Sequence, residues 1–308
     1  MSRTGSGIAF GLAAVLAWAI YNVGVEIGHA QGLRSADLTL LRYAGGAAVM
    51  LPLLVLGRAN PFGGTTPMRL AILVVVAGPP FAWAINTGYS LAPLSHAVVI
   101  SPGMTMIVAS LLTRLVGSQP IPTNRKIGMA LLLVGLVIMA SDRDGAKLPG
   151  EGTWTGDLCF VLSGSLWGVF TWLMGYWRLD AVRSTGAIAI ASTVIYLPIY
   201  LIWFDLPRLP AEVWALQAVY QGALGGALAV VFFTASIARL GGGAAAVFPA
   251  LVPPAAVLAA VPMTARLPNG LQAAGIAAAT LGLLISLDLI GAALRRRPQN
   301  PDHETGCR

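Results

Sequence analysis

Long apolar runs alternate along the chain with short connections rich in proline, glycine and charge. A helix needs about 20 mostly apolar residues to cross the hydrocarbon layer of a membrane. The pattern predicts ten such helices and therefore an all-α integral membrane protein. The expected spans are 7–28, 36–57, 70–91, 94–115, 124–141, 158–177, 184–204, 213–238, 243–265 and 270–293.

The composition excludes several classes of protein. Apolar residues make up 56% of the chain and charged residues 10%, against about 25% charged in soluble proteins. The net charge of +7 arises from scattered Lys and Arg that form no basic face, so we expect no nucleic-acid partner. Two cysteines, Cys159 and Cys307, provide no disulfide framework or metal cluster, and no cofactor or metal is expected.

The distribution of basic residues predicts the orientation in the membrane. Thirteen Lys and Arg fall in the amino terminus, the even-numbered loops and the tail, against five in the opposite loops. Cytoplasmic loops carry the basic excess, so both termini are expected in the cytoplasm, and we expect a multi-pass protein of a bacterial inner membrane. Residues 295–308 have no apolar periodicity and are expected to form a disordered cytoplasmic tail whose three arginines contact anionic lipid.

The second half of the chain repeats the first. The segment Gly7–Trp18 returns at Gly156–Trp167, 149 residues later, and Pro198 follows Pro52 by 146. Ala97-x4-Pro102 returns as Ala244-x4-Pro249, and Gly128-x6-Gly135 as Gly275-x6-Gly282, each 147 residues later. Five spans per copy make the copies enter from opposite sides, as in secondary transporters. We therefore expect two inverted five-helix repeats, 1–145 and 146–294, around a central cavity.

These segments resemble the drug/metabolite transporter superfamily, specifically its EamA-type carriers with ten helices. The resemblance rests on Gly7–Trp18 and its copy, on Leu41-Arg42-Tyr43, and on the repeated proline and glycine motifs of the fourth and fifth helices. It implies transport of amino acids or related metabolites. Efflux of drugs or other cations is left open as an alternative substrate class.

One helix face of each repeat is expected to line the cavity. Trp18, Tyr21 and Asn22 lie at positions i, i+3 and i+4, and therefore share a face. A buried amide is costly unless satisfied, so Asn22 should face the interior of the bundle; helix packing is the alternative role for this face. The other expected binding residues are the copies Trp167, Phe170 and Thr171, the polar Asn86, Tyr89, Ser101 and Thr105, and their apolar counterparts Phe232 and Phe248.

Prolines inside the spans indicate hinges, and charges inside the spans indicate an ion pair. Pro102, Pro249 and Pro253 should bend cavity-lining helices and serve as hinges, unless they only shape the packing. Arg42 and Glu26 are expected to form an ion pair at the external mouth, with independent exposure of each to water as the alternative.

The predicted function is secondary transport of a small amphipathic metabolite by alternating access, as export or facilitated exchange. We expect the protein to act as a monomer whose partners are a small-molecule solute and membrane lipid. An integral membrane enzyme is the alternative from another class, although no histidine pair or paired-carboxylate motif supports it. A channel is a third interpretation, without a charged ring or filter motif in the sequence.

Overall fold

The computed structural model describes residues 2–60, 62, 64–92, 94–118, 120–141, 152–256, 258 and 268–288, and every regular element in these ranges is helical. The last part of the ninth predicted span and residues 289–308 lie outside the described residues. The elements are α1 (Arg3–Ala30), α2 (Ser35–Leu56), α3 (Pro67–Ala77), α4 (Pro79–Leu91), α5 (Leu94–Leu115), α6 (Thr123–Ala140), α7 (Thr153–Tyr176), α8 (Ala181–Trp203), α9 (Ala211–Gln217), η1 (Ala218–Leu228), α10 (Ala229–Leu240), α11 (Gly242–Ala245), η2 (Phe248–Leu251) and α13 (Gly270–Ser286).

These elements build the expected membrane fold. Six helical segments are long and apolar enough to cross a membrane: α1, α2, α3 with α4, α7, α8, and the run from α9 through α10. Shorter apolar helices occur at Val99–Leu115, Gly242–Ala256 and Gly270–Ser286, and α6 adds 18 residues. The protein is an all-helical integral membrane protein whose ten predicted spans all contain helix.

The bounds differ from the predicted spans mainly at helix starts. Helix α1 begins at Arg3 instead of residue 7 because the Ser2 side chain caps it by accepting a hydrogen bond from the Gly5 N–H. Helix α7 begins at Thr153, five residues before the predicted start at 158. Hydropathy reports the apolar part of a helix, whereas capping decides where the helix itself begins.

The third and eighth spans are less regular than expected. The third breaks between α3 and α4 at Gly78, because Pro79 lacks the N–H that would continue the helix and occupies the first turn of α4 instead. A β-carbon on Gly78 would lie 2.0 Å from the Val74 carbonyl oxygen, so this break needs glycine. The eighth span widens into a π-helix over η1, where its glycines approach α2.

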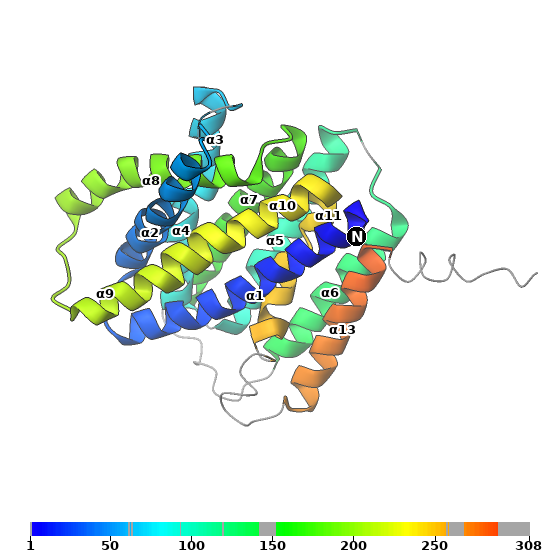
Figure 1. The fold of residues 1–308 in the computed structure, drawn as a ribbon. Helices are drawn as coiled ribbons and strands as arrows, with labels where there is room; N and C mark the ends of the chain where they lie inside the picture. The colour runs from blue at the N-terminus through cyan, green and yellow to red at the C-terminus, as the bar shows by residue number, and fades with distance from the viewer. Residues whose placement is uncertain are drawn as a thin grey trace, which may run out of the picture.

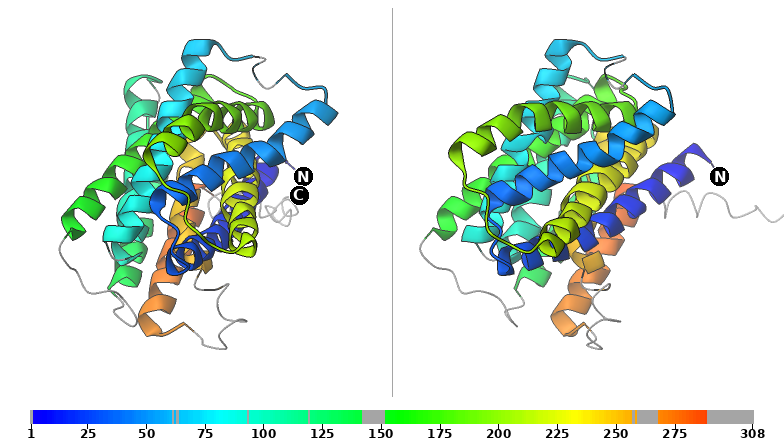
Figure 2. Two further views of the ribbon diagram at one scale, coloured as in Figure 1. Left: turned by 90° about the vertical axis from the view of Figure 1, so that its left-hand side faces the viewer. Right: turned by 60° about the vertical axis from the view of Figure 1, so that its left-hand side comes forward.

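Helices at equivalent positions of the two repeats pack against each other. Helix α6 contacts α13, and α2 contacts α8, as Figures 1 and 2 show. Helices α6 and α13 approach closely because glycine has no side chain. A β-carbon on Gly128 would lie only 2.5 Å from the Gly282 carbonyl oxygen. The repeated glycines of the fifth helices are thus residues at which these two helices meet.

Candidate functional site

A cavity of about 110 Å³ lies between the two halves of the bundle. The first half contributes polar groups from α1, α2, α4 and α5, and the second half contributes rings and aliphatic groups from α7 and the η2 region. The charged, hydroxyl and amide side chains of the lining therefore all come from the first half, whereas apolar side chains come from both halves. Its lining comprises Trp18, Tyr21, Asn22, Arg42, Phe81, Ile85, Tyr89, Ala97, Ser101, Pro102, Thr105, Trp167, Pro249, Val252 and Pro253.

Two tryptophans from equivalent positions meet at this cavity. The Trp18 and Trp167 rings lie edge to face, with 5.6 Å between centroids and an interplanar angle of 77°. Phe233 of α10 stacks on Trp167 at 5.9 Å, and Phe81 lies 4.6 Å from the same ring. Such aromatic clusters hold ring positions closely because edge-to-face and offset contacts are directional.

Arg42 contributes a positive charge to the cavity. Its side chain is only 3% exposed, and its guanidinium carbon lies 5.1 Å from the centroid of the Tyr21 ring and 5.6 Å from that of Phe81. It also lines a second, smaller cavity of about 10 Å³ together with Trp167 and Ile188. Arg42 is thus buried in the bundle, where it lines both cavities.

The expected ion pair between Arg42 and Glu26 stays a prediction, because the Glu26 side chain lies outside the described residues. Among the carboxylates that the structure does describe, none forms an ion pair with Arg42.

Five of the expected binding residues lie outside the cavity lining. Asn86 is buried and its amide nitrogen donates to the Thr39 hydroxyl at 3.4 Å. The Thr171 hydroxyl donates back to the Trp167 carbonyl of its own helix. Phe170 packs against Trp167, Phe232 lies near Phe10, and Phe248 fills the space left by Gly11.

The sequence did not single out two of the lining residues, Phe81 and Ile85. Both are apolar, and they resemble the other apolar residues of the same helix. The break at Gly78 is the one sequence signal for Phe81, because it sets α4 at a new angle just before that residue.

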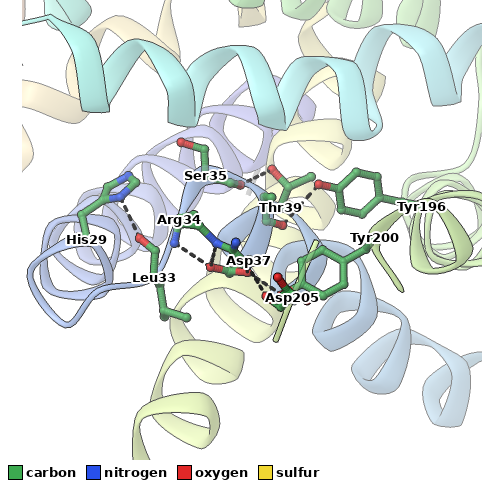
Figure 3. Close-up of polar contacts among 10 residues, drawn as sticks. His29, Leu33, Arg34, Ser35, Asp37, Thr39, Tyr196, Tyr200 and Asp205 are labelled. Atoms are coloured by element: carbon green, nitrogen blue, oxygen red, sulfur yellow. Dashed lines mark hydrogen bonds and ion pairs between the residues drawn. The ribbon is translucent and has the colours of Figure 1, made fainter. Parts of the chain in front are cut away.

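A polar cluster joins α2 to α8 at the end of the bundle that the loop charges predict to be external (Figure 3). Asp37, which is fully buried, accepts hydrogen bonds from the Arg34 guanidinium at 3.0 and 3.1 Å and from the Tyr200 hydroxyl. The Arg34 guanidinium also donates to the Asp205 carbonyl, and the Tyr196 hydroxyl donates to the backbone of Ala36. The hydrogen bond to Asp37 raises the pKa of Arg34 above its usual value.

A second polar contact joins the halves at the same end. His96 of α5 and Asp157 of α7 lie 2.8 Å apart, between Nδ1 and Oδ1. Both clusters therefore link a helix of the first repeat to one of the second.

The opposite end of the α2–α8 pair is held differently. The offset that aligns Pro52 with Pro198 also aligns Met50 and Leu54 with Tyr196 and Tyr200. Leu54 and Met50 pack against Gly186, where a β-carbon would lie 2.4 Å from a Leu54 methyl carbon. One end of this helix pair is thus closed by hydrogen bonds and the other by apolar packing.

Comparison with known proteins decides the family. A model of the EamA-like transporter family matches residues 5–141 and again residues 154–287. The chain belongs to the EamA-like transporter family. This membership confirms the resemblance to the drug/metabolite transporter superfamily, and the two matched segments correspond to two copies of one EamA unit.

A solved structure shares the EamA fold described above. A crystal structure of a protein with 17% sequence identity superposes with a TM-score of 0.74, covering 95% of this chain and 99% of that chain. No curated protein matches the chain.

Proposed function

We propose that this EamA-family protein is a secondary transporter that moves a small amphipathic metabolite, an amino acid or related compound, by alternating access through the cavity between its repeats. The observation that carries this proposal is the cavity itself, whose charged, hydroxyl and amide groups come from the first repeat and whose apolar groups come from both repeats. Such a lining fits a solute with a polar head group and an apolar remainder.

The arrangement of α2 and α8 supports alternating access. Inverted repeats permit a carrier to exchange two related conformations that open to opposite sides. The hydrogen bonds of Asp37 at one end can exchange with water, whereas the Leu54–Gly186 contact at the other end is apolar. If the bundle opened at the Asp37 end, water could replace the broken hydrogen bonds. If it opened at the Leu54 end, apolar surface would become exposed to water.

Export or facilitated exchange is the proposed mode. The charged group in the described cavity lining is Arg42, and arginine side chains do not act as proton relays. The same charge disfavours a cationic drug as the solute. The cavity is built from a single chain, which supports function as a monomer.

Purified protein in liposomes tests this proposal. We expect vesicles preloaded with an unlabelled amino acid to accumulate the radiolabelled form transiently and saturably, because counterflow requires a site exposed alternately to each side. A channel would give flux without counterflow, and an enzyme would return a chemically altered solute. Either result would contradict the proposal.

A further inference from the structure

Arg42 is a buried cation whose described neighbours are aromatic rings. The rings of Tyr21 and Phe81 lie within 6 Å of the guanidinium, where their π faces attract a cation. Within the described part of the chain no carboxylate pairs with it. Two rings offset part of the cost of burial, but they supply no negative charge.

A buried guanidinium without an anion is unusual on energetic grounds. Arginine stays charged in proteins, and a buried charge is normally paired or functional. Arg42 lines both cavities, so a small anion entering the larger one would meet it directly.

The fold of the repeat does not require a cation at the position of Arg42. Under the offset of 146 residues between Pro52 and Pro198, Arg42 corresponds to Ile188, which is also buried. The repeat therefore folds with an apolar side chain at the equivalent place. Gly226 of η1 packs closely against the Arg42 backbone. Any larger residue would clash there, since a β-carbon on Gly226 would lie 2.4 Å from the Arg42 carbonyl oxygen.

The Tyr21 hydroxyl is a second polar group of this cavity. It is buried and has no hydrogen-bond partner among the described residues, and Tyr21 lines the cavity together with Arg42. A buried hydroxyl in that state costs free energy that a bound acceptor would recover. The cavity of about 110 Å³ is smaller than the ~150 Å³ that holds benzene, so the ligand is small.

We propose that the cavity binds the carboxylate of its solute, with the Arg42 guanidinium as the anion-binding group and the Tyr21 hydroxyl as a further donor. This inference rests on the proposed transport function and names its substrate class. A planar guanidinium matches a carboxylate through two parallel hydrogen bonds, which a lysine ammonium cannot reproduce.

Matched compounds test the proposal in proteoliposomes. The probes are the small amino acids alanine and threonine, each offered as the acid, as its amide and as its decarboxylated amine. For the skeleton that wild-type protein exchanges, we expect the amide and the amine to compete about 30-fold more weakly than the acid, or worse. Arg42→Gln should remove this preference, and Arg42→Lys should retain part of it.

Arg58→Gln is the matched control, since it removes an exposed arginine at the other end of α2 and should leave the preference intact. Folding of every variant is checked by gel filtration and thermal unfolding. Tyr21→Phe, which keeps the ring and removes the hydroxyl, is the second variant and should weaken binding of the acid about tenfold.

Three results would overturn the inference. The first is wild-type protein that exchanges amines or amides as well as acids; transport would then stand while the carboxylate site fails. The second is an Arg42→Gln protein that keeps its preference for acids. The third is a loss of transport that is the same for acid, amide and amine, and the same in Arg42→Gln, Glu26→Gln and the double variant. That result would mean that Arg42 serves only to pair with Glu26 in the fold. A folded wild-type protein that exchanges no solute at all would instead refute the transport function.

Discussion

Trp18 and Trp167 occupy equivalent positions in the two repeats and touch each other edge to face, with 5.6 Å between their ring centroids. The two rings, one from α1 and one from α7, meet at the cavity, and both line it. Inverted symmetry thus places the same residue type on both sides of the proposed transport route.

Loss of either ring should weaken solute recognition. We expect Trp18→Ala and Trp167→Ala to raise the KM for exchange about tenfold, equivalent to about 1.4 kcal/mol, while the protein still inserts into the membrane. Trp203→Ala is the control, because Trp203 is 77% exposed at the end of α8. Unchanged KM in both cavity variants, at normal expression, would show that the rings serve packing alone.

The buried Asp37 should stabilise the fold. Asp37→Asn replaces a charged acceptor of the Arg34 and Tyr200 hydrogen bonds, so it should lower the free energy of unfolding by about 1–3 kcal/mol. The thermal midpoint of the purified protein measures this loss. Asp180→Asn is the matched control, because Asp180 is exposed and caps α8, a role in which asparagine serves equally. Equal midpoints for the two variants would contradict a stabilising role of the polar cluster.

The glycines between α6 and α13 should tolerate no side chain. Gly282→Ala would bring a β-carbon to 2.6 Å from the Gly128 carbonyl oxygen, which forces the helices apart. We expect a loss of about 1–3 kcal/mol in stability, seen as a lower thermal midpoint. Gly270→Ala should be neutral, since a β-carbon there meets nothing within 4 Å. A neutral Gly282→Ala would mean that the two helices do not pack this closely.

Both termini should lie in the cytoplasm. The basic residues favour this orientation by thirteen to five, so a reporter fused after Arg297 should be active inside the cell. Three predicted spans separate Ser118 from Leu206, so reporters fused at these two positions should lie on opposite sides of the membrane. External activity of the fusion after Arg297 would reverse the orientation, and with it the assignment of the Asp37 cluster to the external end.

Sequence patterns predicted the fold because its main determinants are local. The length of an apolar run predicts a span, and the internal repeat predicts which span is its equivalent. The pairing of Trp18 with Trp167 followed from the offset of 149 residues between the first helices of the two repeats. The break at Gly78 and the π-helix of η1 are different, because each depends on how a neighbouring helix approaches.

Cavity lining was harder to predict than membrane depth. Phe248 was expected to line the cavity, but its ring lies against Gly11 of α1. Arg42 was expected to pair with Glu26, and the structure adds the rings of Tyr21 and Phe81 beside its guanidinium. Both outcomes depend on the rotation of a helix about its axis and on side chains far away in the sequence, which a pattern along one helix does not encode.

Blocking the cavity while measuring exchange tests the central claim most directly. In a Cys159→Ser, Cys307→Ser background, Ser101→Cys places a thiol in the cavity, and Leu111→Cys places one at a half-exposed position of the same helix. After treatment with a charged methanethiosulfonate, counterflow of the amino acid that wild-type protein exchanges fastest should stop in the Ser101→Cys protein and continue in the Leu111→Cys protein. Excess unlabelled amino acid should slow the modification of Cys at position 101. Full counterflow by completely modified Ser101→Cys protein would show that solute does not pass through this cavity.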